Sequence, residues 1–394
     1  MSSDPRREVG RRIAAARRAR RMTQPELAAA AHLSLSMLRK VEQGSRAPGD
    51  HTLDAIADAL RLDPSRLIDD PARTGGRVRA TLPALSAAIA AYDIAVDAPW
   101  RPPAVLEETA AQAEAYRLGA QYTRLATVVP RLVTESIAAV HGAPEGPERQ
   151  RAARLLVSVA RSADAVAYKF GARDLSARLI ELMRWAAPQS DDPLLCATVG
   201  YVRAEIFFVA RAHQAGLRAL ESAIDEAPDA VCRRSTAALG ALHMRAAVIA
   251  GRAGDVDAAD VHLRHAERLA DGVREGVYGG TAFGPASVRV HRTSVAVGLG
   301  GDHATGVLHL NGDWRPPEEL PAERRSGYFI ETARAQLWSG RVDRAFESLK
   351  AARHIAPQHT REHPWARETA ATLRRLRRAD AEALTSFAEW IGAV

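Results

Sequence analysis

Hydrophobic and polar positions along the chain predict helices almost throughout, and the most distinct pair lies between residues 23 and 44. Thr23 and Glu26 have the spacing of a capping box, in which each side chain binds the other residue's backbone N–H group. Ser34 is suited to cap the next helix, and Gly44 is suited to end it. This pattern predicts two short helices joined by a tight turn.

The second of these helices has an inner and an outer side. Leu38 and Val41 are spaced to face inward. The outer side carries Leu35, Ser36, Arg39 and Lys40. Such a pair is typical of a module that reads DNA, and Arg39 or Lys40 is suited to bind guanine. The alternative is a small helical bundle in which both cations only face solvent.

The chain from residue 9 to residue 68 resembles the phage-repressor/Cro-like (XRE-type) helix-turn-helix family. The shared positions are Arg17, Thr23–Gln24, Glu26–Ala28, Val41–Gly44, Pro48 and Thr52–Leu53. The resemblance implies a five-helix, lambda-repressor-like DNA-binding domain with a buried ion pair between Arg17 and Glu42, and with Gln24 on a phosphate. The DNA-binding residues would be Gln24, Ser34, Leu35, Ser36, Arg39, Lys40 and Arg46. Where the family usually has glycine in the turn, this chain has His32, so we expect modest strain in an intact turn.

The pattern changes after the predicted DNA-binding domain, which spans residues 1–68. Residues 69–82 lack apolar periodicity and contain proline and glycine, so they predict a linker. Residues 83–394 are again helical, with few strand signals. The predicted fold class is therefore all-α.

The C-terminal part repeats a unit of about 40 residues that is predicted to be a helical hairpin. Small residues that let two helices approach recur at spacings of 40, 43, 47 and 39, at Ser176, Gly216, Ala259, Gly306 and Ala345. Four residues after each stands an apolar residue: Ile180, Leu220, Leu263, Leu310 and Leu349. Five residues before four of them stands a glycine: Gly171, Gly254, Gly301 and Gly340. Stacked units of this kind bury the face that one hairpin leaves exposed.

This unit resembles a degenerate tetratricopeptide repeat, and residues 171–208 also resemble actinobacterial helix-turn-helix regulators with repeat-type sensor domains. The layout is similar to that of peptide-responsive quorum-sensing regulators. The repeat resemblance implies that the first helix of each pair lines a concave face, which gives a ligand groove of Arg161, Tyr168, Lys169, Tyr201, Glu205, Phe208, Met244, Arg252, His291, Arg334 and Trp338. These residue types suit a peptide or a compact amphipathic molecule with a carboxylate. The alternative is an ordinary helical domain whose aromatic residues form its core.

Charge is concentrated in the N-terminal part. The formal net charge is +7, of which residues 1–68 contribute +5. The near balance of the remaining chain argues against a long nucleic-acid groove there. Neither a targeting segment nor an uninterrupted apolar run of membrane length is evident, so we expect a cytoplasmic protein without a membrane partner.

Few residues suggest catalysis or metal binding. Cys196 and Cys232 lie in alanine-rich stretches without a C-x-x-C partner, which favours reduced core thiols. The glycine-rich residues 298–306 lack the Gly-Lys-Ser/Thr ending of a phosphate loop. Two histidine pairs have metal-ligand spacing, His262 with His265 and His359 with His363. Because no further ligand frame accompanies them, the sequence predicts no metal, no cofactor and no enzyme.

These features together predict a DNA-binding transcription regulator whose second domain dimerises and senses a peptide, a small molecule or a protein. One recognition helix covers only a few base pairs, so we expect a homodimer on an inverted-repeat operator with half-sites about 34 Å apart. The alternative is an adaptor, in which the repeats hold a protein partner and the small N-terminal domain localises or assembles the complex.

Overall fold

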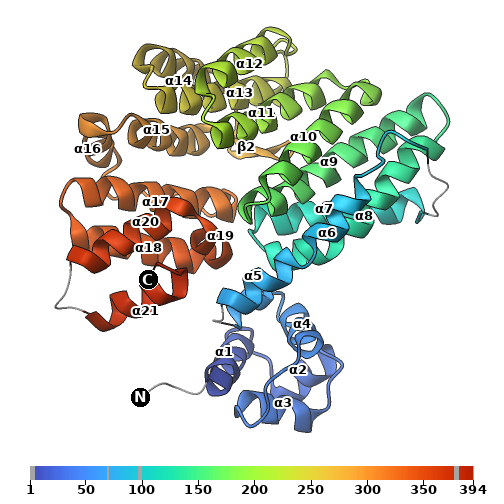
Figure 1. The fold of residues 1–394 in the computed structure, drawn as a ribbon, viewed down its shortest axis with the longest axis vertical. Helices are drawn as coiled ribbons and strands as arrows, with labels where there is room; N and C mark the ends of the chain where they lie inside the picture. The colour runs from blue at the N-terminus through green and yellow to red at the C-terminus, as the bar shows by residue number, and fades with distance from the viewer. Residues whose placement is uncertain (1–4, 69–70, 96–99, 377–380, 394) are drawn as a thin grey trace.

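The N-terminal domain is a bundle of short helices around a small apolar core. The computed structural model describes residues 5–68, 71–95, 100–376 and 381–393. The helices of this domain are α1 (Pro5–Ala19), α2 (Gln24–Ala30), α3 (Leu35–Glu42), α4 (Asp50–Ala59) and the 3-10 helix η1 (Pro64–Arg66). Ile13, Leu27 and Leu38 are fully buried between them. The predicted five-helix order is present, and the fifth helix is a single turn (Figure 1).

Both predicted caps and the predicted turn form in the α2–α3 pair. The Thr23 backbone N–H donates to Glu26 Oε2 at 2.7 Å, and the Thr23 hydroxyl accepts from the Glu26 N–H at 3.3 Å. The Ser34 hydroxyl accepts from the Met37 N–H at 3.2 Å. His32 has a φ of 52°, so the turn keeps its left-handed residue without glycine.

The predicted linker at residues 69–82 is helical over most of its described length. Residues 69–70 lie outside the described residues, and α5 (Pro71–Arg79) and α6 (Leu82–Ala88) follow. Val78 is fully buried in the main core of the second part, where α5 packs on α8. The predicted linker thus contains a helix that apolar periodicity does not signal, and one buried valine and the contact with α8 stabilise it.

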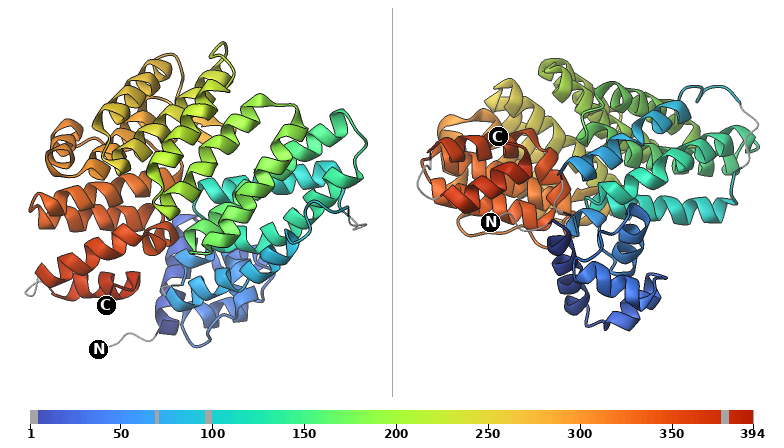
Figure 2. Two further views of the ribbon diagram at one scale, coloured as in Figure 1. Left: turned by 45° about the horizontal axis from the view of Figure 1, so that its top comes forward. Right: turned by 60° about the horizontal axis from the view of Figure 1, so that its bottom comes forward.

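The second part is a curved array of antiparallel helix pairs (Figures 1 and 2). Its pairs are α7 (Pro103–Leu118) with α8 (Tyr122–Gly142), α9 (Pro147–Lys169) with α10 (Arg173–Ala186), α11 (Pro193–Ala210) with α12 (His213–Asp225), α13 (Arg233–Ala253) with α14 (Val256–Ala270), α15 (Pro285–Leu299) with α16 (Gly301–Asn311), and α17 (Ala322–Trp338) with α18 (Val342–Ile355). The 3-10 helix η2 (Ala187–Ser190) follows α10, and a small antiparallel hairpin, β1 (Gly276–Tyr278) with β2 (Thr281–Phe283), separates α14 from α15. The all-α prediction is confirmed, apart from this hairpin.

The turns within the helix pairs share a left-handed residue. Gly171, Gly254 and Gly340 have φ values of +78°, +78° and +70°. Arg211 occupies the same place between α11 and α12 with a φ of 55°, although arginine pays a steric cost there. The predicted glycine frame thus marks these turns, whereas the α11–α12 turn uses Arg211 and the α7–α8 turn uses Ala120, with a φ of 53°, as the left-handed residue.

The repeat frame is wrong in the unit that contains α15 and α16. Gly306 is exposed with nothing within 4 Å of an added Cβ, and Leu310 is 58% exposed. Ala304 and Leu308 are buried instead, two residues earlier. The inserted β1–β2 hairpin accounts for the long spacing before this unit, because it adds residues between α14 and α15.

The last helices of the array return toward its first helices and toward the N-terminal domain (Figure 1). They are α19 (Pro357–Glu362), α20 (Pro364–Leu376) and α21 (Ala381–Ile391). Gln358 of α19 donates from Nε2 to Thr123 Oγ1 of α8 and to Asp63 Oδ1, both at 2.6 Å. Arg66 of η1 donates to the Ile355 carbonyl at 2.8 Å. The array and the N-terminal domain therefore meet at α19.

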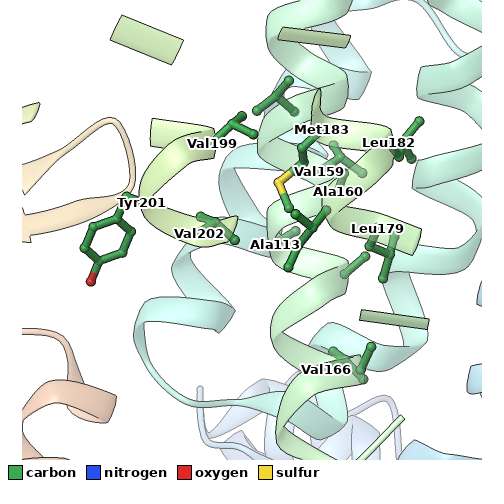
Figure 3. Close-up of a cluster of buried hydrophobic side chains, with 14 of the residues drawn as sticks. Ala113, Val159, Ala160, Val166, Leu179, Leu182, Met183, Val199, Tyr201 and Val202 are labelled. Carbon is green, nitrogen blue, oxygen red and sulfur yellow. The ribbon is translucent and has the colours of Figure 1, made fainter. Parts of the chain in front are cut away.

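The main core of the array lies between α7 and α13 and is built from small and branched side chains. In Figure 3, Val199 and Val202 of α11 lie beside Met183, whereas Tyr201 points to the opposite side of the helix. The two cysteines do not belong to this core. Both are free and exposed, since Cys196 lies on the outer side of α11 and Cys232 precedes the first turn of α13. The prediction of core thiols was therefore wrong.

Among the described residues, α11 is the one helix with the length and composition of a membrane span. Its mean hydropathy over 18 residues is 1.5, and 28% of that window is buried. It carries Arg203 and Glu205 and packs against α10, α12 and α13 in the array.

Candidate functional site

The exposed side of α3 is the first candidate site. Ser36, Arg39 and Lys40 are exposed, Leu35 is partly buried, and Leu38 and Val41 anchor the opposite side in the core. Figure 1 places α3 at the end of the molecule that lies away from the array. The two cations therefore face open space.

An ion-pair network between α1 and α3 fixes the orientation of this helix. Arg17 donates from Nε to Glu42 Oε1 at 2.8 Å and from Nη2 to Glu42 Oε2 at 3.0 Å. Its Nη1 binds the Met22 carbonyl at 2.9 Å, which ties the entry to α2 into the same network. Burial raises the pKa of the Glu42 carboxyl, but the hydrogen bonds from Arg17 and Gln24 outweigh it and hold the pKa below its ordinary value. The ion pair forms as the sequence predicts.

The remaining predicted DNA-binding residues have different surroundings. Gln24 donates from Nε2 to Glu42 Oε2 at 2.7 Å, so its amide supports the ion pair in this structure. Ser34 caps α3. Arg46 is exposed in the segment after α3, and its backbone N–H binds the Lys40 carbonyl at 3.2 Å. These contacts leave the side chains of Arg39, Lys40 and Arg46 as the exposed cations of the predicted set.

The second candidate site is a cavity of about 770 Å³ on the inner side of the array. Residues of α9, α11, α13, α15 and α17, the first helices of five successive pairs, supply much of its wall. The β1–β2 hairpin, α19 and the start of α20 close it. Eight predicted groove residues line it: Arg161, Tyr168, Lys169, Tyr201, Glu205, Phe208, Arg252 and His291.

The other three predicted groove residues lie outside the cavity wall, which corrects their assignment. Met244 is fully buried in the core and is not among the α13 residues that line the cavity, which are Arg245, Val248 and Arg252. Arg334 stacks over Trp338 at 4.8 Å and over Trp365 at 4.3 Å from the ring centroids. Trp338 is 50% exposed. Arg334 therefore reaches the cavity only through Trp365, which lines it.

Several wall residues were not identified from the sequence. Arg245 and Arg324 lie on first helices of their pairs, so the inward periodicity of α13 and α17 was the available signal. Glu323 and His359 come from the start of α17 and from α19, which the repeat frame does not cover. No local pattern places these last two residues near Lys169.

Lys169, Glu323 and His359 form a buried polar group at one end of the cavity. Lys169 Nζ lies 2.7 Å from Glu323 Oε1 and 3.5 Å from His359 Nε2, and Ser326 Oγ lies 2.6 Å from His359 Nδ1. Burial and the neighbouring Lys169 lower the pKa of His359 to about 3. Burial alone would raise the pKa of Glu323, but Lys169 and His359 hold it well below its ordinary value. Near neutral pH the group is therefore a Lys–Glu ion pair beside a neutral imidazole.

The histidine pairs do not form a three-ligand site. Within the described residues, no group of three or more His, Cys, Asp or Glu side chains is placed to hold a metal. His262 contacts His243, with 3.0 Å between their Nδ1 atoms, and His243 stacks on His265. His359 and His363 have ring centroids 5.4 Å apart and line the cavity.

Comparison with known proteins assigns the N-terminal domain. The helix-turn-helix family model matches residues 13–67, so these residues form a helix-turn-helix DNA-binding domain of the XRE type. No curated protein matches the chain.

Three solved structures are similar to the chain at low identity. PlcR from Bacillus thuringiensis, in complex with the peptide PapR7 and DNA, is 14% identical over 67% of this chain and 95% of its own, with a TM-score of 0.29. Apo ComR from Streptococcus vestibularis is 10% identical over 99% of both chains, with a TM-score of 0.30. Apo ComR from S. thermophilus is 12% identical over 56% of this chain and 94% of its own, with a TM-score of 0.21.

Proposed function

We propose that this chain is a sequence-specific transcription regulator that binds an inverted-repeat operator as a homodimer. The observation that carries the proposal is the exposed Arg39 and Lys40 on α3, the second helix of the α2–α3 pair, in a domain that matches the helix-turn-helix family model. A single α3 reads only a few base pairs, so a second subunit supplies the other half-site about one helical turn away. A regulator of this kind acts in the cytoplasm and needs no catalytic activity.

We further propose that a ligand in the cavity controls operator binding. The support is α19, whose His359 and Glu362 line the cavity while its Gln358 binds Asp63 of the DNA-binding domain at 2.6 Å. Arg79 of α5 also lines the cavity and pairs with Glu362 at 3.2 Å. A ligand that prefers one position of α19 thereby shifts the DNA-binding domain. The charged and aromatic residues of the cavity suit a peptide or a compact amphipathic molecule, so both ligand classes are to be tested.

The DNA-binding proposal is tested by replacing both exposed cations of α3 with alanine. If Arg39 and Lys40 contact operator bases or phosphates, the double variant loses about tenfold or more in affinity, and the slope of log affinity against log salt falls by about 1 to 2. Arg184→Ala, on the exposed surface of α10, is the matched control and keeps the affinity and slope of the unmodified chain. An unchanged affinity and slope in the double variant would refute the proposal and favour the adaptor.

A further inference from the structure

Three guanidinium groups converge on one buried tyrosine in the cavity. Arg245 of α13 lies over the Tyr201 ring at 4.0 Å from its centroid, and Arg161 of α9 lies at 5.9 Å. Arg324 of α17 donates a hydrogen bond to the Tyr201 hydroxyl. Only 3% of Tyr201 is exposed, so the three cations are held together around a group that carries no charge.

The hydrogen bonds of these arginines mostly end on neutral acceptors. Arg161 donates to the Gly279 carbonyl and to the Thr281 hydroxyl, both at 2.6 Å. Arg324 lies 3.1 Å from His291 Nε2. Within the described residues, the carboxylate that pairs directly with this trio is Glu205, 3.5 Å from Arg245. Glu114 acts on Arg161 through its charge, and Glu323 and Glu331 act on Arg324 in the same way. The direct contacts of the three arginines thus include one ion pair.

Two further carboxyl groups lie near the trio. Burial and the neighbouring Glu205 raise the pKa of Asp164 well above its ordinary value. Glu323 is engaged by Lys169 at 2.7 Å and by the Tyr122 hydroxyl at 3.0 Å. Three guanidinium groups thus surround Tyr201, and within the described residues one of them, Arg245, has a direct carboxylate partner.

The cavity wall as a whole carries more cationic than acidic residues. Its cationic residues are Arg79, Arg117, Arg161, Lys169, Arg173, Arg211, Arg245, Arg252, Arg324 and Arg367. Its acidic residues are Asp164, Glu205, Glu323, Glu331 and Glu362. The pKa shifts of Tyr201 and Arg161 agree with this excess of positive charge. Although burial raises the pKa of Tyr201, Arg245 and Arg324 bring it below its ordinary value, and burial together with Arg117 lowers the pKa of Arg161 to about 9.

We propose that the Tyr201 cluster binds a doubly anionic group, such as a phosphate monoester or paired carboxylates, on a compact ligand. The wall carries ten cationic and five acidic residues, which favours an anionic ligand. Three clustered guanidinium groups can together bind the oxygen atoms of a dianion through short, charge-assisted hydrogen bonds. The cavity of about 770 Å³ is large enough for a ligand of several tens of atoms, with Phe208 and Trp365 as apolar surface. This inference rests on the proposed control site and specifies its ligand chemistry.

Calorimetric titration of the full chain at constant ionic strength tests the proposal. The dianionic probes are inorganic phosphate, adenosine monophosphate and succinate, and the matched probes are acetate and adenosine. At least one dianion binds about tenfold or more tightly than acetate or adenosine. The dianion with the highest affinity shows whether the site prefers a phosphate or a dicarboxylate. Dianion affinities no higher than those of the matched probes would overturn the proposal without the use of any variant.

Variants then locate the site. Arg245→Gln weakens the best dianion by about tenfold or more, because it removes one cation from the trio, whereas Arg184→Gln on the outer surface does not. Equal weakening by both, or by neither, contradicts binding at Tyr201. Operator binding is measured on the same samples. If the unmodified chain binds the operator but no dianion, only this inference is refuted. If the unmodified chain does not bind an operator, the proposed function is refuted.

Discussion

Single residues determine how firmly α3 is held against the rest of its domain. The Arg17–Glu42 ion pair is largely buried, with side-chain exposures of 13% and 5%. The domain depends on both partners being present, because a buried carboxylate without a cationic partner is strongly destabilising. The pair therefore makes the orientation of α3 depend on α1.

Arg17→Ala is expected to lower the free energy of unfolding of the N-terminal domain by about 3 kcal/mol, because Glu42 loses its partner in a buried site. Urea unfolding followed by circular dichroism measures this loss. Arg20→Ala, at an exposed position after α1, is the control and changes the free energy by less than about 0.5 kcal/mol. Equal effects of the two variants would show that the ion pair does not hold α3.

His359 makes the stability of the C-terminal domain depend on pH. Its pKa is about 3 in the folded chain, below the ordinary value of 6.5, so the unfolded chain binds more protons between these values. Stability contributed by the neutral imidazole is present above about pH 6.5 and is lost as pH falls through this window. The loss from this one residue between about pH 7 and about pH 5 is about 2 kcal/mol.

His359→Gln removes this part of the pH dependence. The free energy of unfolding is measured by urea titration at about pH 7 and at about pH 5. Its decrease between these two pH values is about 2 kcal/mol smaller in the variant than in the unmodified chain. His303→Gln, at an exposed position in α16, serves as the control and keeps the full dependence. A pH dependence unchanged by His359→Gln would contradict a buried neutral imidazole.

At the scale of the helix pairs, close approach decides where a small residue is required. An added Cβ at Gly216 of α12 would lie 2.3 Å from Ile249 Cδ1 and 2.7 Å from Phe207 Cβ. An added Cβ at Gly306 of α16 would meet nothing within 4 Å. The two positions were equivalent in the sequence repeat, and they differ in the structure.

The pair of substitutions Gly216→Ala and Gly306→Ala therefore has effects of opposite sign. Gly216→Ala lowers the free energy of unfolding by about 1 to 3 kcal/mol through overpacking. Gly306→Ala raises it by about 0.5 to 1 kcal/mol, because alanine favours an exposed helix interior. Thermal unfolding of the two variants measures both signs, and destabilisation by Gly306→Ala would show that α16 is packed differently.

The same elements show what local sequence could predict. Caps, turns and helix pairs were predictable because Thr23, Glu26, Ser34 and Gly254 act on neighbours within a few residues. The shift in α16 was not predictable, because it follows from the inserted hairpin, whose short strands carry too little pattern. The helix α5 was missed for a related reason, since its stability comes from Val78 packing on a distant helix.

At the scale of the whole molecule, the cavity forms between segments far apart in sequence. Tyr201 and Arg324 are 123 residues apart, and Lys169 and His359 are 190 apart. The repeat resemblance implied which faces of the first helices point inward, and eight of the residues on those faces line the cavity. It could not place α19, which lies after the last repeat and returns to the first helices of the array.

The contact at Gln358 links the two domains and is expected to control their coupling. Gln358→Ala leaves buried Asp63 and Thr123 without this partner, which costs about 1 to 3 kcal/mol. Hydrogen exchange in η1 and α19 then becomes about tenfold faster or more. Gln189→Ala in η2 is the matched control and leaves exchange at α19 unchanged. Unchanged exchange in Gln358→Ala would contradict a coupling role for this residue.

Selection of bound genomic fragments followed by footprinting is the most direct test that α3 reads DNA in the assembled protein. The account predicts enrichment of an inverted repeat, with two protected half-sites about 34 Å apart, and loss of this protection in the Arg39→Ala, Lys40→Ala double variant. Failure to enrich any common sequence, or protection that persists in the double variant, would contradict the central claim.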